Sequence, residues 1–192
     1  MIEYFAQIYD RVMIASDYHE VFSLQVVISI TYLLALFGSV FRAVNHNELF
    51  SNFLCISVVV TKYMLTALLM EHILLYIQEN NRVDNAQDVY LGLCAFNMLS
   101  IFIVYRLHIR FSYKYGPLFF AVVRLTAVLA LAHFILWFKF VVLNIQEGFA
   151  VLHYLYSFTV LYISGVLGVL MLLPRLVNTR AGRVLSLQLP RG

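Results

Sequence analysis

The chain has 192 residues, of which 62% are hydrophobic and 12% are charged, and its mean hydropathy is +0.85. A soluble domain is about 45–50% apolar and about 25% charged, and a domain of this length could not hide so much apolar surface from water. The composition excludes an ordinary soluble protein and predicts a chain that lies in a lipid bilayer. The continuous apolar runs also exclude the short alternating strands of a membrane β-barrel.

The first 21 residues precede the first long apolar run. Ile2, Phe5, Ile8 and Tyr9 recur at helical spacing, with charged residues on other faces. This pattern predicts a short amphipathic helix over residues 1–21, either on the membrane surface or packed against the bundle. The segment lacks the basic start of a signal peptide, so we expect the first apolar run to stay in the mature protein.

Five segments are long enough to cross a membrane, since about 20 apolar residues span a hydrocarbon core of about 30 Å. They cover residues 22–41, 53–77, 89–105, 117–140 and 150–173. The links between them are short, which forces neighbouring segments to lie antiparallel. The sequence predicts an all-α, polytopic membrane helical bundle over residues 22–174, followed by a basic tail over residues 175–192.

The basic residues outside the spans are unevenly distributed, and this asymmetry predicts an orientation. Eight Lys and Arg residues fall on one side of a five-span topology and two on the other. Cytoplasmic loops carry the excess of Lys and Arg. We therefore expect an integral protein of a bacterial inner membrane, with its N-terminus outside and its C-terminus in the cytoplasm.

A few polar residues lie at membrane depth near the middle of the bundle, where no acid is predicted to accompany them. An unpaired cation there is unfavourable by about 2.5–3.5 kcal/mol on insertion scales. Snorkelling toward lipid phosphate would satisfy Arg124 but not Lys62. Lys62 could lie in the bundle interior, line a water-filled path or meet an acid of a partner subunit. The candidates for a pore or a buried charge are Lys62, Arg124, Asn97 and Thr66.

A second polar group lies toward the outer ends of the spans. It can be interpreted as a belt of snorkelling side chains, or as a proton or cation site with Glu71 as the acid and a histidine as the relay. No HExxH motif and no i, i+4 pair of histidines is present, so neither a metal site nor another cofactor is expected. The members of this group are Glu71, His72, His133, Lys139 and His153.

Small residues on the last span predict close helix packing, either within the chain or between copies. They are Ser157, Ser164, Gly165 and Gly168.

The predicted inner face is basic and suits anionic lipid headgroups or a cytoplasmic protein partner; nucleic acid is not expected. His108 alternates with apolar residues in the same stretch as Arg106, Arg110 and Lys114. We therefore expect these four residues to form an exposed cationic collar at the inner face. The cations proposed to bind lipid or a partner are Arg106, Arg110, Lys114, Arg175, Arg180 and Arg183.

No catalytic or nucleotide-binding motif occurs in the sequence, so an enzyme is not expected. The favoured hypothesis is a membrane component that forms a homo-oligomer, and that either forms or gates a pore or senses the membrane and recruits a cytoplasmic partner. By analogy only, a bacterial two-gene system such as phage defence would fit it. One alternative is a small ion-coupled transporter or subunit that uses the outer Glu and His residues, and another is a lipid-modifying enzyme.

Overall fold

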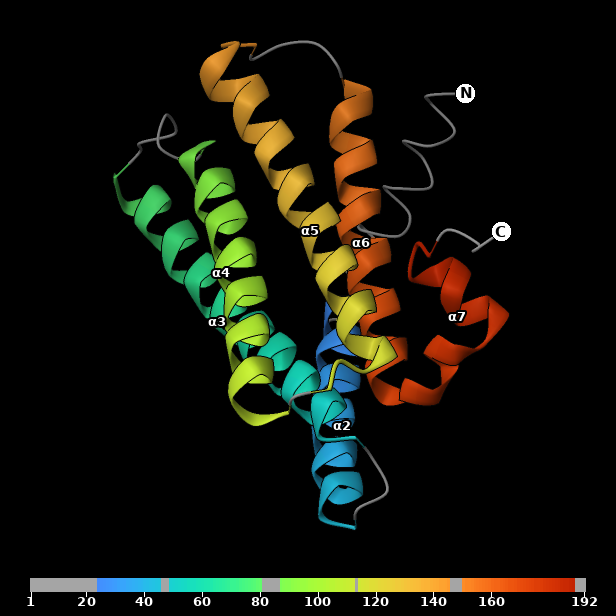
Figure 1. Cartoon of the computed structure of the whole chain (residues 1–192). Helices are drawn as coiled ribbons and strands as arrows, with labels where there is room; N and C mark the ends of the chain where they lie inside the picture. The colour runs from blue at the N-terminus through green and yellow to red at the C-terminus, as the bar shows by residue number, and fades with distance from the viewer. Residues whose placement is uncertain (1–23, 46–48, 81–86, 113, 146–149, 189–192) are drawn as a thin grey trace.

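The computed structural model describes residues 24–45, 49–80, 87–112, 114–145 and 150–188 (Figure 1). These residues are almost entirely helical and include no strand. Side chains of residues 71–80 are not described. The predicted amphipathic helix over residues 1–21 lies outside the described residues.

Five long helices form the bundle, and all five are long and apolar enough to cross a membrane. This confirms the predicted all-α bundle and identifies the chain as a polytopic membrane protein. The helices are α2 (Leu24–Val44), α3 (Phe50–Asn80), α4 (Asp88–Phe111), α5 (Pro117–Trp137) and α6 (Ala150–Leu172). Three shorter elements are the π-helix η3 (Phe138–Val142), the 3₁₀-helix η4 (Pro174–Asn178) and α7 (Arg180–Leu185).

Prolines mark two of the boundaries between helices. The backbone of Gly116 is extended, and Pro117 follows at the first position of α5, where its missing N–H leaves no hydrogen bond unmade. At the other boundary, α6 ends at Leu172 and Pro174 opens η4. The chain therefore turns sharply at both places, which are on the same end of the bundle (Figure 1).

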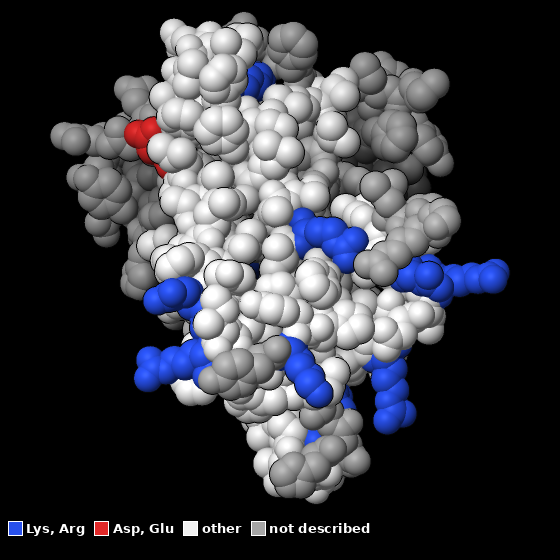
Figure 2. Space-filling view, viewed as in Figure 1, with Lys and Arg blue, Asp and Glu red and all other residues white. Residues whose placement is uncertain are grey.

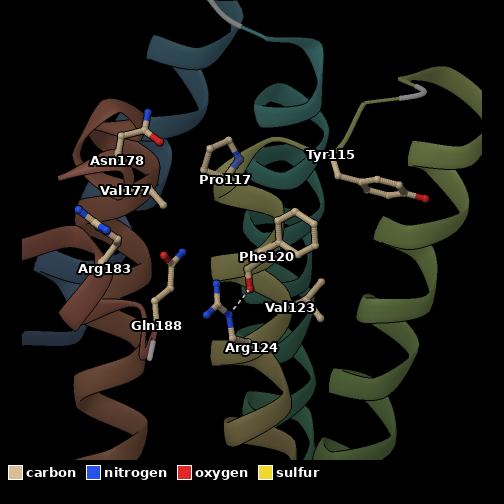
Figure 3. A pocket seen from close by; sticks show the side chains of 9 residues that line it. All are labelled: Tyr115, Pro117, Phe120, Val123, Arg124, Val177, Asn178, Arg183 and Gln188. Carbon is tan, nitrogen blue, oxygen red and sulfur yellow. Dashed lines mark hydrogen bonds between the residues drawn. The ribbon is translucent and has the colours of Figure 1, made fainter. Parts of the chain in front are cut away.

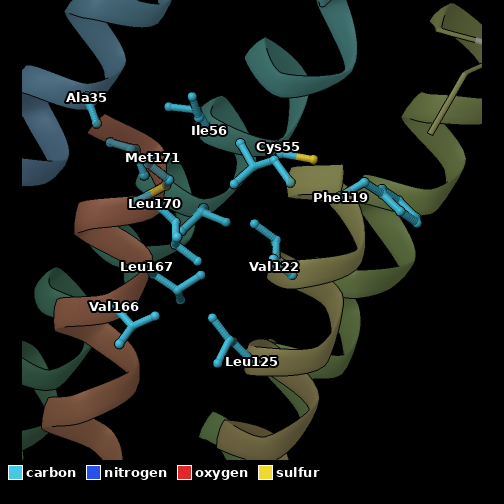
Figure 4. Packing of buried hydrophobic residues seen from close by; sticks show 14 of the residues in the cluster. Ala35, Cys55, Ile56, Phe119, Val122, Leu125, Val166, Leu167, Leu170 and Met171 are labelled. Carbon is cyan, nitrogen blue, oxygen red and sulfur yellow. The ribbon is translucent and has the colours of Figure 1, made fainter. Parts of the chain in front are cut away.

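Helix α5 is the most enclosed of the five. Half of its apolar window is buried, against 17% for α2, because α5 packs against α3, α4 and α6. Figure 4 shows the centre of the core, where Ile56 of α3, Val122 and Leu125 of α5 and Leu167 and Leu170 of α6 meet. A displacement of α5 would disturb all three of its neighbours.

The outer surface of α2 is strongly apolar. Phe37 and Phe41 are each 70% exposed, and Leu34 and Val27 are exposed beside them. Such a surface suits the hydrocarbon of a bilayer and would be unfavourable in water. Most Lys and Arg side chains visible in Figure 2 gather toward one end of the bundle. We call this the basic end; α2, α4 and α6 finish there.

Helices α2 and α6 approach closely at Gly168. A Cβ atom added at Gly168 would lie 3.1 Å from a methyl carbon of Thr31 and 3.3 Å from the ring of Tyr32. The Tyr32 hydroxyl donates to the backbone oxygen of Ser164, 3.1 Å away. Gly168 and Ser164 therefore serve contacts within one chain.

The other two small residues predicted to pack are placed differently. An added Cβ at Gly165 would meet none of the described atoms within 4 Å, and Ser157 is half-buried. Gly165 therefore leaves room beside α6.

The chain after α6 folds back onto the bundle. The Tyr162 hydroxyl of α6 donates to the backbone oxygen of Leu185, 3.3 Å away, and Val177 and Ser186 are buried. A Cβ added at Gly182 would overlap the backbone carbonyl of Leu176. Residues 174–188 thus form a docked segment, which we call the C-terminal tail.

Candidate functional site

Lys62 of α3 lies inside the bundle, with only 9% of its side chain exposed. Its ammonium donates to the Asn97 Oδ1 of α4, 2.9 Å away. The Asn97 amide nitrogen in turn donates to the Leu93 backbone oxygen at 2.7 Å. The Thr66 hydroxyl donates to the Lys62 backbone oxygen, 2.9 Å away, and so serves the helix and not the ammonium.

Within the described residues, the charge of Lys62 meets a neutral amide and no carboxylate. Asp88, at the start of α4, is the one acid whose side chain is described. It precedes Asn97 by nine residues, which is about 13 Å along the helix. Lys62 therefore keeps its charge uncompensated near the centre of the bundle.

A groove of about 200 Å³ lies against Lys62 on the seam between α3 and α4. Ser57 and Thr61 of α3 and Ser100 of α4 are among the residues that line it. The Ser100 hydroxyl donates to the Asn97 backbone oxygen at 2.7 Å. The rest of the groove is apolar and is formed by Val58, Leu65, Phe96, Leu99 and Ile103.

His133 of α5 belongs to a second polar contact, toward the end opposite the basic end. Its Nδ1 atom lies 2.9 Å from the Tyr156 hydroxyl of α6, and the ring of Tyr156 meets the ring of Tyr90 edge to face at 5.7 Å. This contact joins α5 to α6.

Lys139 lies in the wide turn that continues α5, the π-helix η3. It is buried, with its ammonium 3.3 Å from His153 Nε2 and 4.7 Å from the ring centre of Phe140. Such π-helical turns often occur at functional sites. Three members of the predicted outer group thus form two separate contacts between α5 and its continuation and α6. His133 contacts Tyr156, and Lys139 contacts His153. Glu71 and His72 belong to α3, and their side chains are not described.

Sequence reasoning missed a buried chain of hydrogen bonds at the basic end. The Gly116 N–H donates to Ser51 Oγ at 3.0 Å, and Ser51 Oγ lies 2.8 Å from His108 Nε2. His108 Nδ1 lies 2.8 Å from the Val104 backbone oxygen. A carbonyl only accepts, so His108 Nδ1 carries the proton, and the Ser51 hydroxyl completes the chain by donating to Nε2.

The collar interpretation is wrong for His108, which is 1% exposed. Its ring stacks on Tyr115 at 5.7 Å and packs against Phe119 at 4.6 Å. A sequence signal for this burial did exist, because the buried residues of α4 recur every three or four positions on one helix face. They are Leu93, Asn97, Ser100, Val104 and His108.

The six cations predicted to bind lipid or a partner are all exposed; they are Arg106, Arg110, Lys114, Arg175, Arg180 and Arg183. Arg124 is half-buried and donates through Nε to the Phe120 backbone oxygen of its own helix, 3.1 Å away. Arg42 reaches the end of α6, where it donates to the backbone oxygens of Met171 and Leu172 at 3.4 and 3.5 Å. A cation is favourable there because a helix C-terminus carries partial negative charge.

No family model, curated protein or solved structure matches the chain. Among the described residues, no group of three or more His, Cys, Asp or Glu side chains could hold a metal ion. The function is therefore inferred from the polar groups that the bundle holds at membrane depth.

Proposed function

We propose that the protein is a non-enzymatic membrane component that forms a homo-oligomer and gates a pore for small anions. The observation that carries this proposal is the buried, uncompensated Lys62 behind a hydroxyl-bearing groove on the α3–α4 seam. Each copy would contribute its groove to the pore wall, and Lys62 would act as the gate.

The depth of the groove supports an interior position in an assembly. Lys62 follows the start of α3 at Phe50 by 12 residues, which corresponds to about 18 Å in a hydrocarbon core of about 30 Å. Thr61 is exposed at this depth and Ser57 is half-buried. In a lone copy these hydroxyls would face lipid chains, whereas a ring of copies would turn them toward water or toward one another.

The Lys62–Asn97 contact suits a closed gate. An ammonium carries three donors, and Asn97 Oδ1 accepts one of them. Rotation of the flexible lysine stem would release the ammonium from Asn97 and bring it toward Ser57 and Ser100. The apolar side chains that form the rest of the groove would exclude water until then, as hydrophobic constrictions do in channels.

The sign of the charge decides the selectivity. A cation in a low-dielectric wall attracts anions and repels cations, and rings of Lys or Arg are used in this way in anion pores. In the described part of the chain no acid reverses the sign near Lys62. We therefore assign small anions such as chloride as the permeant species.

The exposed cations extend the proposal to the membrane surface. The basic end would face the cytoplasm of a bacterial cell, following the distribution of Lys and Arg. There Arg106, Arg110 and Lys114 would contact anionic lipid headgroups, and Arg175 and Arg180 remain open to a cytoplasmic protein. Such a partner could report on, or set, the state of the gate.

Anion flux into proteoliposomes tests the role of Lys62. We expect Lys62→Gln to reduce chloride flux at least tenfold, because the buried charge is removed while a polar side chain remains. Lys114→Gln is the matched control, since it makes the same change at an exposed lysine, and it should keep flux within twofold of the unmodified protein. Equal flux in Lys62→Gln and the unmodified protein would contradict the proposal.

Cysteine cross-linking tests whether the groove faces other copies. Cys55 is buried and Cys94 is half-buried, so Cys94 is first replaced by alanine. Thr61→Cys should then give cross-linked oligomers in membranes. Phe158→Cys, on an exposed position of α6, should give few. Efficient cross-linking at Phe158 and none at Thr61 would place the interface elsewhere and exclude a pore lined by this groove.

The His133–Tyr156 contact favours the second candidate, an ion-coupled transporter in which His133 relays a proton. The two functions differ in how many copies they need. A protein that is active as a monomer and loses coupled transport in His133→Gln would favour the transporter over the pore.

A further inference from the structure

A cavity of about 820 Å³ lies between the beginning of α5 and the C-terminal tail. In Figure 3, Pro117 and Arg124 of α5 lie toward the tail, whereas Phe120 and Val123 lie toward Tyr115. Tyr115 contributes from the link before α5. The tail contributes Val177, Asn178, Arg183 and Gln188.

Two arginines give this cavity a net positive charge. Arg124 of α5 uses Nε to bond the Phe120 backbone oxygen, which leaves the two terminal nitrogens of its guanidinium as further donors. Arg183 comes from α7 on the opposite side. Among the described residues that line the cavity, none is acidic.

Neutral donors accompany the two charges. Asn178, Gln188 and Tyr115 line the same space, and in Figure 3 the Tyr115 hydroxyl points away from Arg124. In Figure 3 the Gln188 amide lies on the side facing the Arg124 guanidinium. The first turn of α5 adds the partial positive charge of a helix N-terminus. This combination of donors fits the several oxygens of a phosphate group.

The remaining walls are apolar. Arg124 lies seven residues into α5, at a depth of about 10 Å from Pro117. Pro117, Phe120, Val123 and Val177 form the apolar part of the cavity. The cavity therefore offers two arginines and an apolar side, and a small soluble anion would use only the arginines.

We propose that this cavity binds a phosphate group and that the phosphate belongs to an anionic phospholipid. The phosphate lies between Arg124 and Arg183, and guanidinium groups bind phosphate through paired hydrogen bonds. The first part of an acyl chain lies along Phe120 and Val123. Occupied in this way, the cavity holds the tail against α5 through one lipid. This site is independent of the proposed pore, because it lies away from the α3–α4 groove.

Native mass spectrometry of the full chain in detergent tests the site, with phosphatidylglycerol, phosphatidylcholine and inorganic phosphate as probes. We expect one tightly retained phosphatidylglycerol per chain and at least tenfold weaker retention of phosphatidylcholine. Arg124→Gln and Arg183→Gln should each reduce phosphatidylglycerol retention about tenfold. Arg180→Gln, which removes an exposed arginine of the same helix as Arg183 but outside the cavity, should change it less than twofold.

The three probes separate the sources of the phosphate. Retention of phosphatidylglycerol that millimolar inorganic phosphate does not displace supports a lipid. Displacement by inorganic phosphate supports a phosphate site and overturns the lipid assignment. If Arg124→Gln fails to fold, Arg183→Gln gives the same measurement, because the Arg183 side chain is exposed. Equal losses in Arg180→Gln and Arg183→Gln would overturn the site, because they would show only a general effect of surface charge.

Discussion

Two buried polar contacts join α3 to α4, and they differ in how completely their hydrogen bonds are satisfied. At the basic end, Ser51 and His108 form a closed chain in which both ring nitrogens and the hydroxyl have partners. Nearer the centre, Lys62 meets a single amide oxygen of Asn97. In the first contact both ring nitrogens and the hydroxyl have partners, whereas the Lys62 ammonium has one acceptor among the described residues.

The difference distinguishes a contact that builds the bundle from one that is available for function. A neutral, fully bonded group stabilises the arrangement that satisfies it, since any movement would leave a buried donor or acceptor unpaired. A lone cation is unfavourable in the same surroundings. Under the pore proposal, Lys62 would carry out its function in the open state.

The largest change in stability is expected from Ser51→Ala. In this variant the Gly116 N–H loses its partner and His108 Nε2 keeps only the weak contact with Cys55 Sγ, 3.8 Å away; each lost partner costs about 1–3 kcal/mol. Equilibrium unfolding in mixed micelles should show a loss of roughly 2–6 kcal/mol. Ser57→Ala, at a half-buried serine of the same helix, is the control and should lose much less. Equal losses in the two variants would remove the special role of the Ser51–His108 chain.

Lys62→Met should act in the opposite direction. Removing the uncompensated charge should stabilise the bundle by about 2–3 kcal/mol, close to the cost of a buried lysine on insertion scales. The same variant should lose anion flux, so stability and activity would change with opposite signs. A destabilised Lys62→Met would show that the ammonium contributes to the fold and would weaken the comparison.

Asn97→Leu should destabilise the protein by about 1.5–3 kcal/mol, the usual range for a hydrogen bond to a charged group. In the Lys62→Met background the same substitution should cost much less, because no ammonium remains to be satisfied. A double-mutant cycle measures this coupling directly. A coupling near zero would mean that the 2.9 Å contact contributes little.

Thr66→Val should have the smallest effect, less than about 1 kcal/mol, the value of a typical neutral hydrogen bond. The Thr66 hydroxyl bonds a backbone oxygen that already belongs to a helix. Flux should also stay within twofold of the unmodified protein. A large loss of flux would show that Thr66 contacts the ammonium when the gate is open.

The membrane fold could be predicted from the sequence because apolar length alone specifies a spanning helix. The depth of Lys62 followed from the same counting of residues. Its acceptor was harder to assign, since backbone, hydroxyl and amide groups all occur at that depth, and only the packing of α3 on α4 selects Asn97.

Other features depend on contacts that a linear pattern does not specify. His108 stands among arginines in the sequence, and this position predicts an exposed side chain. In the structure His108 is buried. The docking of the tail depends on Gly182, where backbone meets backbone, and a single glycine in a basic segment carries no such signal. Both cases arise from close approaches between segments.

The position of the cavity between α5 and the C-terminal tail couples two equilibria. One wall belongs to the bundle and the other to the tail, so whatever binds there favours the docked tail, and the docked tail raises affinity for the same molecule. Such coupling is reciprocal by thermodynamic necessity. A protein that binds the undocked tail would therefore compete with the anionic phospholipid in the cavity. The amount of anionic lipid in the membrane would then set how much of that protein is bound.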